Sequence, residues 1–383
     1  MKRSFLRRTI PQLSLSFLAI APFAKAVDIV LVYDNANSDE PVEDSDGSKL
    51  TAIMEAAEEY WEDIIKGPQV LTITYHYDTS SPSNGQFYNS TENNSFVTSG
   101  KIRFRPNPTL GWWWDPTPLD NSEYNLGETL VRDMAPAVRD AMFAPGAPRL
   151  LEALYWGTPA EGAPDDAVNK RDMFTYAIHE MGHALGMTGN LTTTAAEIAD
   201  NDYDLDPLLL NGANASTLLD PGGGSHIECN GCLMNTNVGP SLRKLPSAAD
   251  VLSIATCPDI DGVLNTNQGW LVIDLPRKEF LPGGSLNWNI AGNWIGARLP
   301  DSDDRANIRL SSEMNGDHSV FLSNNGVCRE LFLSGSNGLS TGSNRLDIAE
   351  AGFLVHDGTL PRPRALVQPG GELEANKLTV SGA

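Results

Sequence analysis

The chain has 383 residues, and 49 Asp and Glu against 27 Lys and Arg give it a formal net charge of −22 at pH 7. Most of the acidic excess lies between residues 27 and 262. A surface of this charge repels phosphates, which excludes nucleic acid and anionic membranes from the expected partners. The length allows two domains with a sizeable core.

The N-terminal segment has the pattern of an export signal. Four basic residues precede an apolar stretch from Leu13 to Phe23, and Ala24-Lys25-Ala26 forms a small-x-small cleavage site. We therefore expect residues 1–26 to be a signal peptide cleaved near Ala26, and the mature protein to be secreted or held at the cell surface. No later segment reaches the roughly 18 consecutive apolar residues of a membrane-spanning helix, so we expect no transmembrane segment.

The first part of the mature chain predicts strands around one helix. Residues 27–33 have the pattern of a buried strand, and apolar residues at helical spacing predict a helix over 48–66. Residues 70–77 alternate as a strand does. We expect a loop over the Ser-, Asn- and Gly-rich residues 79–100, and a short edge strand from Lys101 to Arg105.

A second helix is predicted over residues 122–143. Its apolar face would hold Leu130, Met134, Val138 and Met142, and Pro136 would introduce a kink. Just before it, the three consecutive tryptophans at 112–114 cannot all face one way. We expect at least one of them to be exposed and the others to pack against this second helix.

The segment 176–186 reads YAIHEMGHALG and contains the pattern HExxH at His179, Glu180 and His183. Side chains four residues apart on an α-helix project from one face, so both imidazoles can bind one metal ion. Glu180 then lies where it can take a proton from water and pass it on. The pattern is that of a zinc peptidase.

The residues around this pattern predict a half-buried helix. Asp172 stands at the position of an N-cap, and Gly186 and Gly189 would end the helix. The alternative is an amphipathic helix that carries two ordinary surface histidines.

A catalytic zinc ion usually takes three protein ligands and leaves one position open. The compact pattern HExxHxxGxxH fails here, because Gly189 stands where its third histidine would be. The next histidine is His226, and we assign it as the third ligand. Asp220 and Glu228 are weaker candidates, and a glutamate ligand would indicate the gluzincin plan instead.

The order of features after the pattern resembles the metzincin clan of zinc metallopeptidases. His226 precedes Met234 by eight residues, and a helix signal follows in which Ser247 and Asp250 have the spacing of a capping box. The insertion after Gly186 makes the arrangement similar to the leishmanolysin-type branch, over roughly residues 27–257.

This resemblance implies an α+β catalytic domain over residues 27–262, built from a twisted sheet, helices, the HExxH helix and a Met-turn. It implies Zn²⁺ as cofactor, with His179, His183 and His226 as ligands and Met234 beneath them. It also implies a protein or peptide substrate and Glu180 as general base.

The connection 187–225 carries Asp200, Asp202, Asp204 and Asp206 at every second position. Alternating carboxylates supply the oxygen ligands that Ca²⁺ prefers, although the spacing is not that of an EF-hand. A Ca²⁺ site and a solvated acidic loop are both open for this segment.

The four cysteines, at positions 229, 232, 257 and 328, predict disulfides in an exported protein, with three full pairings open. Cys229 and Cys232 form a CxxC that lacks a second pair. We therefore expect them to be part of a disulfide near the site and not a second zinc site.

Residues 263–383 differ in composition from the rest of the chain. They are rich in Gly, Asn and Ser, predict short strands at 270–273, 306–310, 319–322 and 330–333, and carry no helix signal. We expect an all-β region. The segment from Trp288 to Asp304 and the tail after Gly370 resemble the β-solenoid repeats of autotransporter-associated proteins, which would allow association with the cell surface.

The function expected from the sequence is that of an exported zinc-dependent endopeptidase. One alternative is a surface adhesin or passenger protein whose protease-like domain serves binding, although a binding module has no use for Glu180. A non-peptidase zinc hydrolase is the other alternative, and the likeness around Met234 disfavours it.

Overall fold

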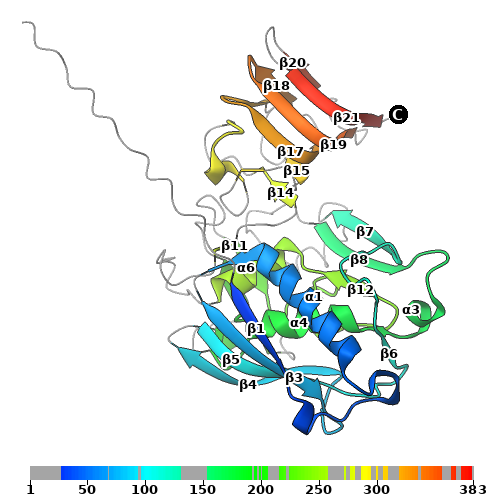
Figure 1. Cartoon of the computed structure of the whole chain (residues 1–383). Coiled ribbons are helices and arrows are strands. Elements are labelled where there is room, and N and C mark those ends of the chain that lie inside the picture. Colours follow the sequence, from blue (N-terminus) through cyan, green and yellow to red (C-terminus); the bar gives the residue numbers. More distant parts are fainter. Residues whose placement is uncertain are drawn as a thin grey trace, which may run out of the picture.

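The computed structural model of the chain is a mixed α/β structure with several small sheets and few helices (Figure 1). It describes residues 27–67, 69–93, 96–130, 153–191, 194–195, 198–199, 201–205, 215–220, 224–257, 271–272, 277–280, 286–294, 299–300, 305–308, 319–334, 338–355, 364–367 and 372–381. The predicted signal peptide and the predicted boundary at residue 262 lie outside these residues. Within them, no helix has the length and apolar character needed to cross a membrane.

A four-stranded sheet forms the N-terminal part of the molecule. Its spatial order is β1 (Asp28–Tyr33), β3 (Val70–Tyr77), β5 (Phe96–Phe104) and β4 (Gly85–Asn93). The first three strands are parallel, and β4 runs antiparallel to β5 at the edge. The predicted strands at 27–33 and 70–77 are thereby confirmed.

Two predictions for residues 79–105 are wrong. The expected loop contains strand β4 and the first half of β5, and Lys101 lies in an interior strand, between β3 and β4. Turn-like composition predicts a loop, but cross-strand pairing from Gly85 opposite Phe104 to Asn93 opposite Phe96 overrides that local preference. The edge strand is therefore β4.

Helix α1 (Ser48–Ile64) packs against strand β1 of this sheet and against the helix that carries HExxH, α4 (Met173–Ala184), which itself contacts β4 and β5 (Figure 1). It confirms the helix predicted over 48–66. Its apolar positions are buried on one face, and Trp61 Nε1 donates a hydrogen bond of 2.9 Å to the carbonyl of Ile178 in α4. The two helices and the sheet share one hydrophobic core, which fixes α4 relative to β4.

The prediction of a second helix over 122–143 is wrong for the residues that the structure describes. Residues Tyr124–Leu130 form strand β7, which pairs antiparallel with β8 (Ala153–Pro159), and β12 (Arg243–Leu245) completes this sheet. Positions 131–143 of that prediction lie outside the described residues. Tyr124, Leu126 and Leu130 fit a period of two as well as a helical one, and pairing with β8 decides between them.

The tryptophans lie in and beside β6 (Trp112–Trp113), which pairs with β9 (Arg171–Asp172). Trp112 is buried edge-on against Tyr176 of α4, and Trp113 and Trp114 are half-buried, so none of the three is fully exposed. The expected partner, a second helix, is replaced by α4.

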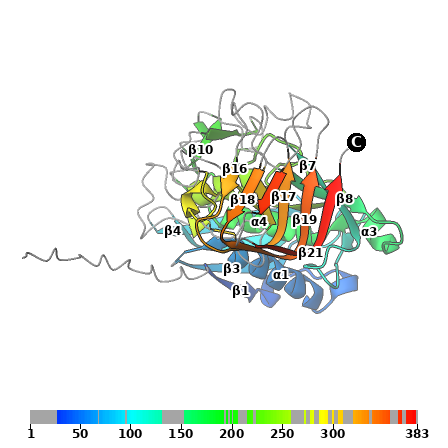
Figure 2. The same cartoon turned by 90° about the horizontal axis from the view of Figure 1, so that it is seen from above.

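The C-terminal part consists of two parallel sheets with a core of their own, and Figure 2 shows their neighbouring strands pointing the same way. Each of the strands predicted at 270–273, 306–310, 319–322 and 330–333 is confirmed by a strand that overlaps it. The described residues after 271 contain no α-helix. One parallel sheet contains β14 (Arg277–Glu279), β15 (Arg305–Ile308), β17 (Gly326–Ser334), β19 (Arg345–Val355) and β21 (Glu372–Ser381). The other contains β16 (Ser319–Phe321), β18 (Gly338–Gly342) and β20 (Arg364–Val367). Outside both, β13 (Leu271–Val272) pairs antiparallel with β2 (Ile65–Lys66).

Candidate metal centre

Helix α4 begins and ends where the sequence predicts. The Asp172 carboxylate accepts hydrogen bonds from the backbone N–H and the hydroxyl of Thr175, which satisfies donors at the helix N-terminus, and the helix stops just before Gly186. The expectation of a half-buried helix is wrong, because every residue of α4 is buried. Helix α1 and strands β4 and β5 cover one side, and the segment 224–257 covers the other.

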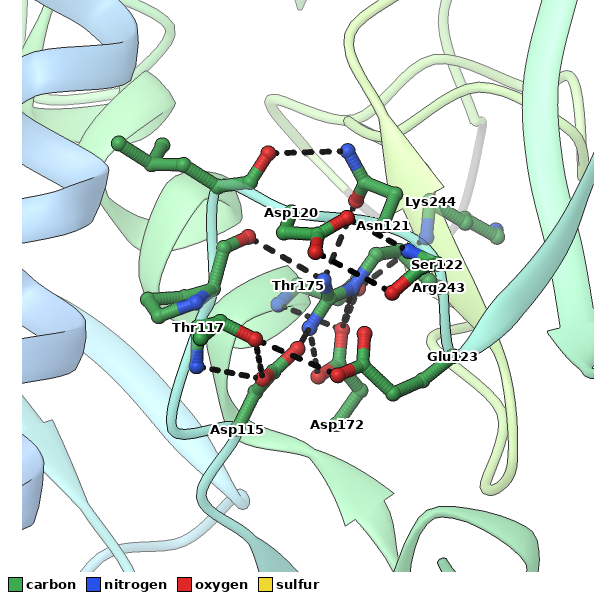
Figure 3. A network of polar contacts seen from close by, with 12 residues as sticks. Asp115, Thr117, Asp120, Asn121, Ser122, Glu123, Asp172, Thr175, Arg243 and Lys244 are labelled. Carbon is green, nitrogen blue, oxygen red and sulfur yellow. Dashed lines mark hydrogen bonds and ion pairs between the residues drawn. The ribbon is translucent and has the colours of Figure 1, made fainter. Parts of the chain in front are cut away.

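A buried ion-pair network holds the N-terminal end of α4. Figure 3 shows the guanidinium of Arg243 between the carboxylates of Asp172 and Asp115, at 2.7 and 2.8 Å from Nη2. Nε donates to Asp172, and Nη1 donates to Asn121 and to the carbonyl of Pro118, so all five N–H groups are used. The network ties β12, the tryptophan loop and the start of α4 together.

The three predicted histidines converge. Nε2 of His183 lies 3.2 Å from Nε2 of His179 and 3.2 Å from Nε2 of His226. His179 and His183 lie one turn apart on α4, whereas His226 comes from the loop before β12. These three residues form the one group of the described chain that could hold a metal ion.

The proton positions of two rings favour cation binding. Nδ1 of His179 lies 2.7 Å from the carbonyl of Leu233, and Nδ1 of His183 lies 2.5 Å from the carbonyl of Met187. A carbonyl only accepts, so both Nδ1 atoms carry the proton and both Nε2 atoms present a lone pair. Two lone pairs 3.2 Å apart repel each other, and a cation between them removes that repulsion.

Burial keeps these imidazoles neutral. It lowers the pKa of His179 to about 3 and the pKa of His183 well below its ordinary value, and the neighbouring His226 lowers both further. Neutral imidazole is the form that binds a metal, so protons compete weakly for these nitrogens at neutral pH.

Glu180 lies beside this cluster and is fixed by the edge strand. Its Oε2 accepts a hydrogen bond of 2.7 Å from the backbone N–H of Phe87 in β4, and burial raises its pKa to about 8. Gly85 leaves room for it, because a methyl group there would lie 2.9 Å from Oε1. The sequence carried no signal for β4 in this role, since its residues have loop-like composition.

Met234 packs against helix α4 at Gly182. It is fully buried, and a Cβ atom on Gly182 of α4 would lie 2.6 Å from its sulfur. The Asp250 carboxylate accepts from the backbone N–H groups of Leu233 and Met234, at 3.0 and 2.8 Å, and forms the predicted capping box with Ser247. Asp250 therefore positions the Leu233 carbonyl that orients His179, a role that its capping signal did not reveal.

Neither alternative to His226 joins the cluster. Glu228 is exposed, and the half-buried carboxylate of Asp220 accepts from the Thr236 hydroxyl at 3.1 Å. Ile227, which lies between His226 and Glu228, is buried, and its N–H donates to the carbonyl of Met234.

A cleft with a volume of about 590 Å³ opens over the cluster. Glu180 and the three histidines line it, and β4 forms one wall. The other lining residues are Ser83, Asn84, Gly85, Gln86, Phe87, Arg171, Tyr176, Thr188, Ser225, Thr236, Asn237 and Val238. A buried carboxylate and three convergent imidazoles in such a cleft can bind a cation and move a proton beside it.

The predicted disulfides are contradicted, because all four cysteines are buried thiols. Cys229 and Cys232 contact each other through a hydrogen bond that lowers the pKa of the Cys229 thiol, and burial raises the pKa of Cys232. Cys257 packs against Gly186, whereas Cys328 belongs to the separate C-terminal core. Long-range pairing with Cys328 is therefore excluded by the fold.

The expected calcium loop is only partly described. Asp202 and Asp204 lie in strand β10 (Asp202–Leu205), where the Asp204 carboxylate accepts from Ser216 of β11 (Ala215–Leu218). Asp200 and Asp206 lie outside the described residues. Strand geometry, and not a loop, thus holds the middle of this acidic stretch.

The sequence and the structure were compared with known proteins. No family model matches the chain, and neither a curated protein nor a solved structure matches it.

Proposed function

We propose that this protein is an exported zinc-dependent endopeptidase with a metzincin-like catalytic domain. The observation that carries the proposal is the convergence of His179, His183 and His226 beside Glu180 in an open cleft. The signal-like pattern of residues 1–26 supports export.

The spacing of the imidazole nitrogens supports zinc. Two nitrogens bound tetrahedrally at the usual zinc distance are separated by about 3.3 Å. The two Nε2 separations of 3.2 Å agree with this value. The ligand set leaves a fourth position for water or substrate, as in catalytic sites that have three protein ligands.

The residues of the chain can carry out hydrolysis as follows. Zinc, when bound, would supply Lewis acidity to the scissile carbonyl and allow water to act as a nucleophile near neutral pH. The positive charge of bound zinc would favour the ionised form of Glu180. In that form the carboxylate takes the proton of the attacking water and delivers it to the departing amine. The backbone N–H of Phe87 holds the carboxylate in place for both transfers.

Strand β4 offers a way to align a peptide. It is the edge of the four-stranded sheet and lines the cleft through residues 85–87, so its outer edge can pair with an extended substrate. This edge is not the Lys101–Arg105 segment that the sequence predicted as an edge strand.

The C-terminal region supports a further part of the proposal. The parallel registers β15–β17–β19–β21 and β16–β18–β20 are compatible with stacked coils of a β-solenoid. We propose that this region is solenoid-like and holds the peptidase at the cell surface.

Replacing Glu180 by Gln tests the mechanism. The amide keeps its size and can still accept from Phe87, but it cannot take a proton. We expect cleavage of casein to fall by about 10²- to 10⁴-fold, while the zinc content measured by atomic absorption stays that of the wild type.

Glu228→Gln is the matched control, because it removes an exposed carboxylate two residues from a ligand. It should change neither cleavage nor zinc content. A wild-type rate for Glu180→Gln would contradict the mechanism, and loss of zinc from Glu228→Gln would contradict the ligand set.

A further inference from the structure

One arginine side chain lines the cleft, and the hydrogen-bond acceptors of its guanidinium are uncharged. Arg171, in β9 directly before α4, is the sole Lys or Arg among the described residues that line it, and Glu180 is the sole carboxylate. The rest of the lining contains no Asp, Glu, Lys or Arg. In a chain with a net charge of −22, this position is a local exception.

The guanidinium of Arg171 is anchored on one side. Nη1 donates to the Tyr176 hydroxyl at 2.8 Å and to the Val238 carbonyl at 3.2 Å, and Nε donates to the Thr109 carbonyl at 3.3 Å. None of these acceptors is a carboxylate. The side chain is half-buried, and within the described residues the two N–H groups of Nη2 have no protein acceptor.

Arg243 shows how the same side chain is treated when its role is structural. It is fully buried, bonds two carboxylates and uses all five N–H groups. Arg171 keeps its charge unmatched and two donors available at a cleft. Such a group binds an anion from outside more strongly than a matched one does, because no internal ion pair has to be broken.

The position of Arg171 relates it to the reacting centre. Its partner Tyr176 lies on α4 one turn before Glu180, a distance of about 6 Å along the helix. An extended peptide covers about 3.3 Å per residue, so this distance corresponds to about two substrate residues.

Resting on the proposed peptidase function, we propose that Arg171 selects substrates with a Glu or Asp side chain within about two residues of the scissile bond. The substrate carboxylate accepts from the Nη2 donors of Arg171, while Tyr176 and Val238 hold the guanidinium in place. The peptidase therefore prefers acidic peptide segments.

The experiment uses two peptide libraries that differ only in Glu or Gln at each of the two positions on either side of the scissile bond. For the wild type, we expect kcat/KM to favour Glu over Gln by about 10-fold or more at one position, as for a charge-assisted hydrogen bond. Arg171→Gln should bring that ratio close to 1, and Arg171→Glu should invert it, so that Gln is favoured over Glu.

Binding gives a second readout that needs no turnover. In the Glu180→Gln background with zinc, the Kd of the Glu peptide, measured by fluorescence anisotropy, should be about 10-fold lower than that of the Gln peptide. Adding Arg171→Gln should remove this difference. Lys170→Gln is the matched control, because its ammonium pairs with Asp166 outside the cleft and its loss should leave the ratio unchanged.

The outcomes separate the two proposals. If the wild type cleaves no peptide, the proposed function fails. If it cleaves Glu and Gln peptides equally well, or if Arg171→Gln folds with zinc bound and keeps the preference for Glu, the function stands and the role of Arg171 is overturned.

Discussion

The polar groups at the two ends of helix α4 differ in how they are paired. At the N-terminal end, Arg243 pairs with the carboxylates of Asp172 and Asp115 and uses all five of its N–H donors within the chain. At the other end, the Nε2 lone pairs of His179 and His183 face each other at a separation of 3.2 Å. The difference separates roles along one helix, because matched groups stabilise the fold and unmatched groups remain available for a ligand.

The largest effect on stability is expected from Arg243→Met. Methionine fills similar space but leaves the carboxylates of Asp172 and Asp115 buried without a cation. We expect the free energy of unfolding to fall by about 3–5 kcal/mol, measured by urea denaturation.

Lys170→Gln is the control for Arg243→Met. It breaks the Lys170–Asp166 ion pair, whose side chains are 28 % and 53 % exposed, and should lower the free energy of unfolding by less than about 1 kcal/mol. Equal urea midpoints for Arg243→Met and the wild type would show that the network does not hold the helix.

A substitution at the histidine end of α4 should weaken metal binding without lowering the free energy of unfolding. His226→Ala removes one imidazole from a half-buried position and leaves α4 intact. We expect zinc affinity, measured by competition with a chelator, to fall by more than about 100-fold, since loss of outer partners alone costs 10- to 100-fold.

Without zinc, His226→Ala should unfold at nearly the urea concentration of the metal-free wild type. A large destabilisation there would mean that His226 is a structural residue, and the comparison between the ends would fail.

Gly182→Ala tests how closely the helix lies on Met234. The added methyl group would lie 2.6 Å from the methionine sulfur, so the turn or the helix has to shift. We expect a loss of about 1–3 kcal/mol in the free energy of unfolding, together with weaker zinc binding.

Gly189→Ala is the control, because its methyl group would lie 3.5 Å from Ile198, an ordinary contact. If both variants unfold alike, Met234 does not determine the packing of this end.

The smallest expected effect on stability is that of Glu58, a carboxylate on α1 that lies away from both ends of α4. Burial, then Glu62, Glu55 and Asp28, raise the pKa of Glu58 on α1 to about 7. Because this pKa is raised in the folded state, the free energy of unfolding falls as pH rises from 4.5, the ordinary pKa of the group, to about 7. Over this range the unfolded chain releases the proton before the folded chain does.

Glu58→Gln should therefore be more stable than the wild type at pH 7.5, by less than about 1 kcal/mol since the group is half-exposed, and show no gain at pH 4. Thermal unfolding at both pH values measures this. The exposed Glu59 gives the control, and Glu59→Gln should change stability by less than about 0.5 kcal/mol. An equal gain for Glu58→Gln at both pH values would show that charge is not the cause.

Local patterns determined the parts of this protein that depend on nearby residues. The i and i+4 spacing of His179 and His183, the Asp172 cap and the apolar face of α1 each follow from helical geometry, and the structure contains all three. The order of His226 and Met234 in the sequence also led to the third imidazole, although no local rule places it.

Tertiary structure decided what depends on distant pairing. Strand β4 has the composition of a loop and becomes the cleft wall only because β5 pairs with it, and residues 124–130 become a strand only beside β8. The Leu233 carbonyl that orients His179 and the Val238 carbonyl that holds Arg171 likewise come into place only when α4 meets the segment 224–257. Side-chain periodicity describes one element at a time, whereas hydrogen-bond partners and charge balance depend on which elements come together.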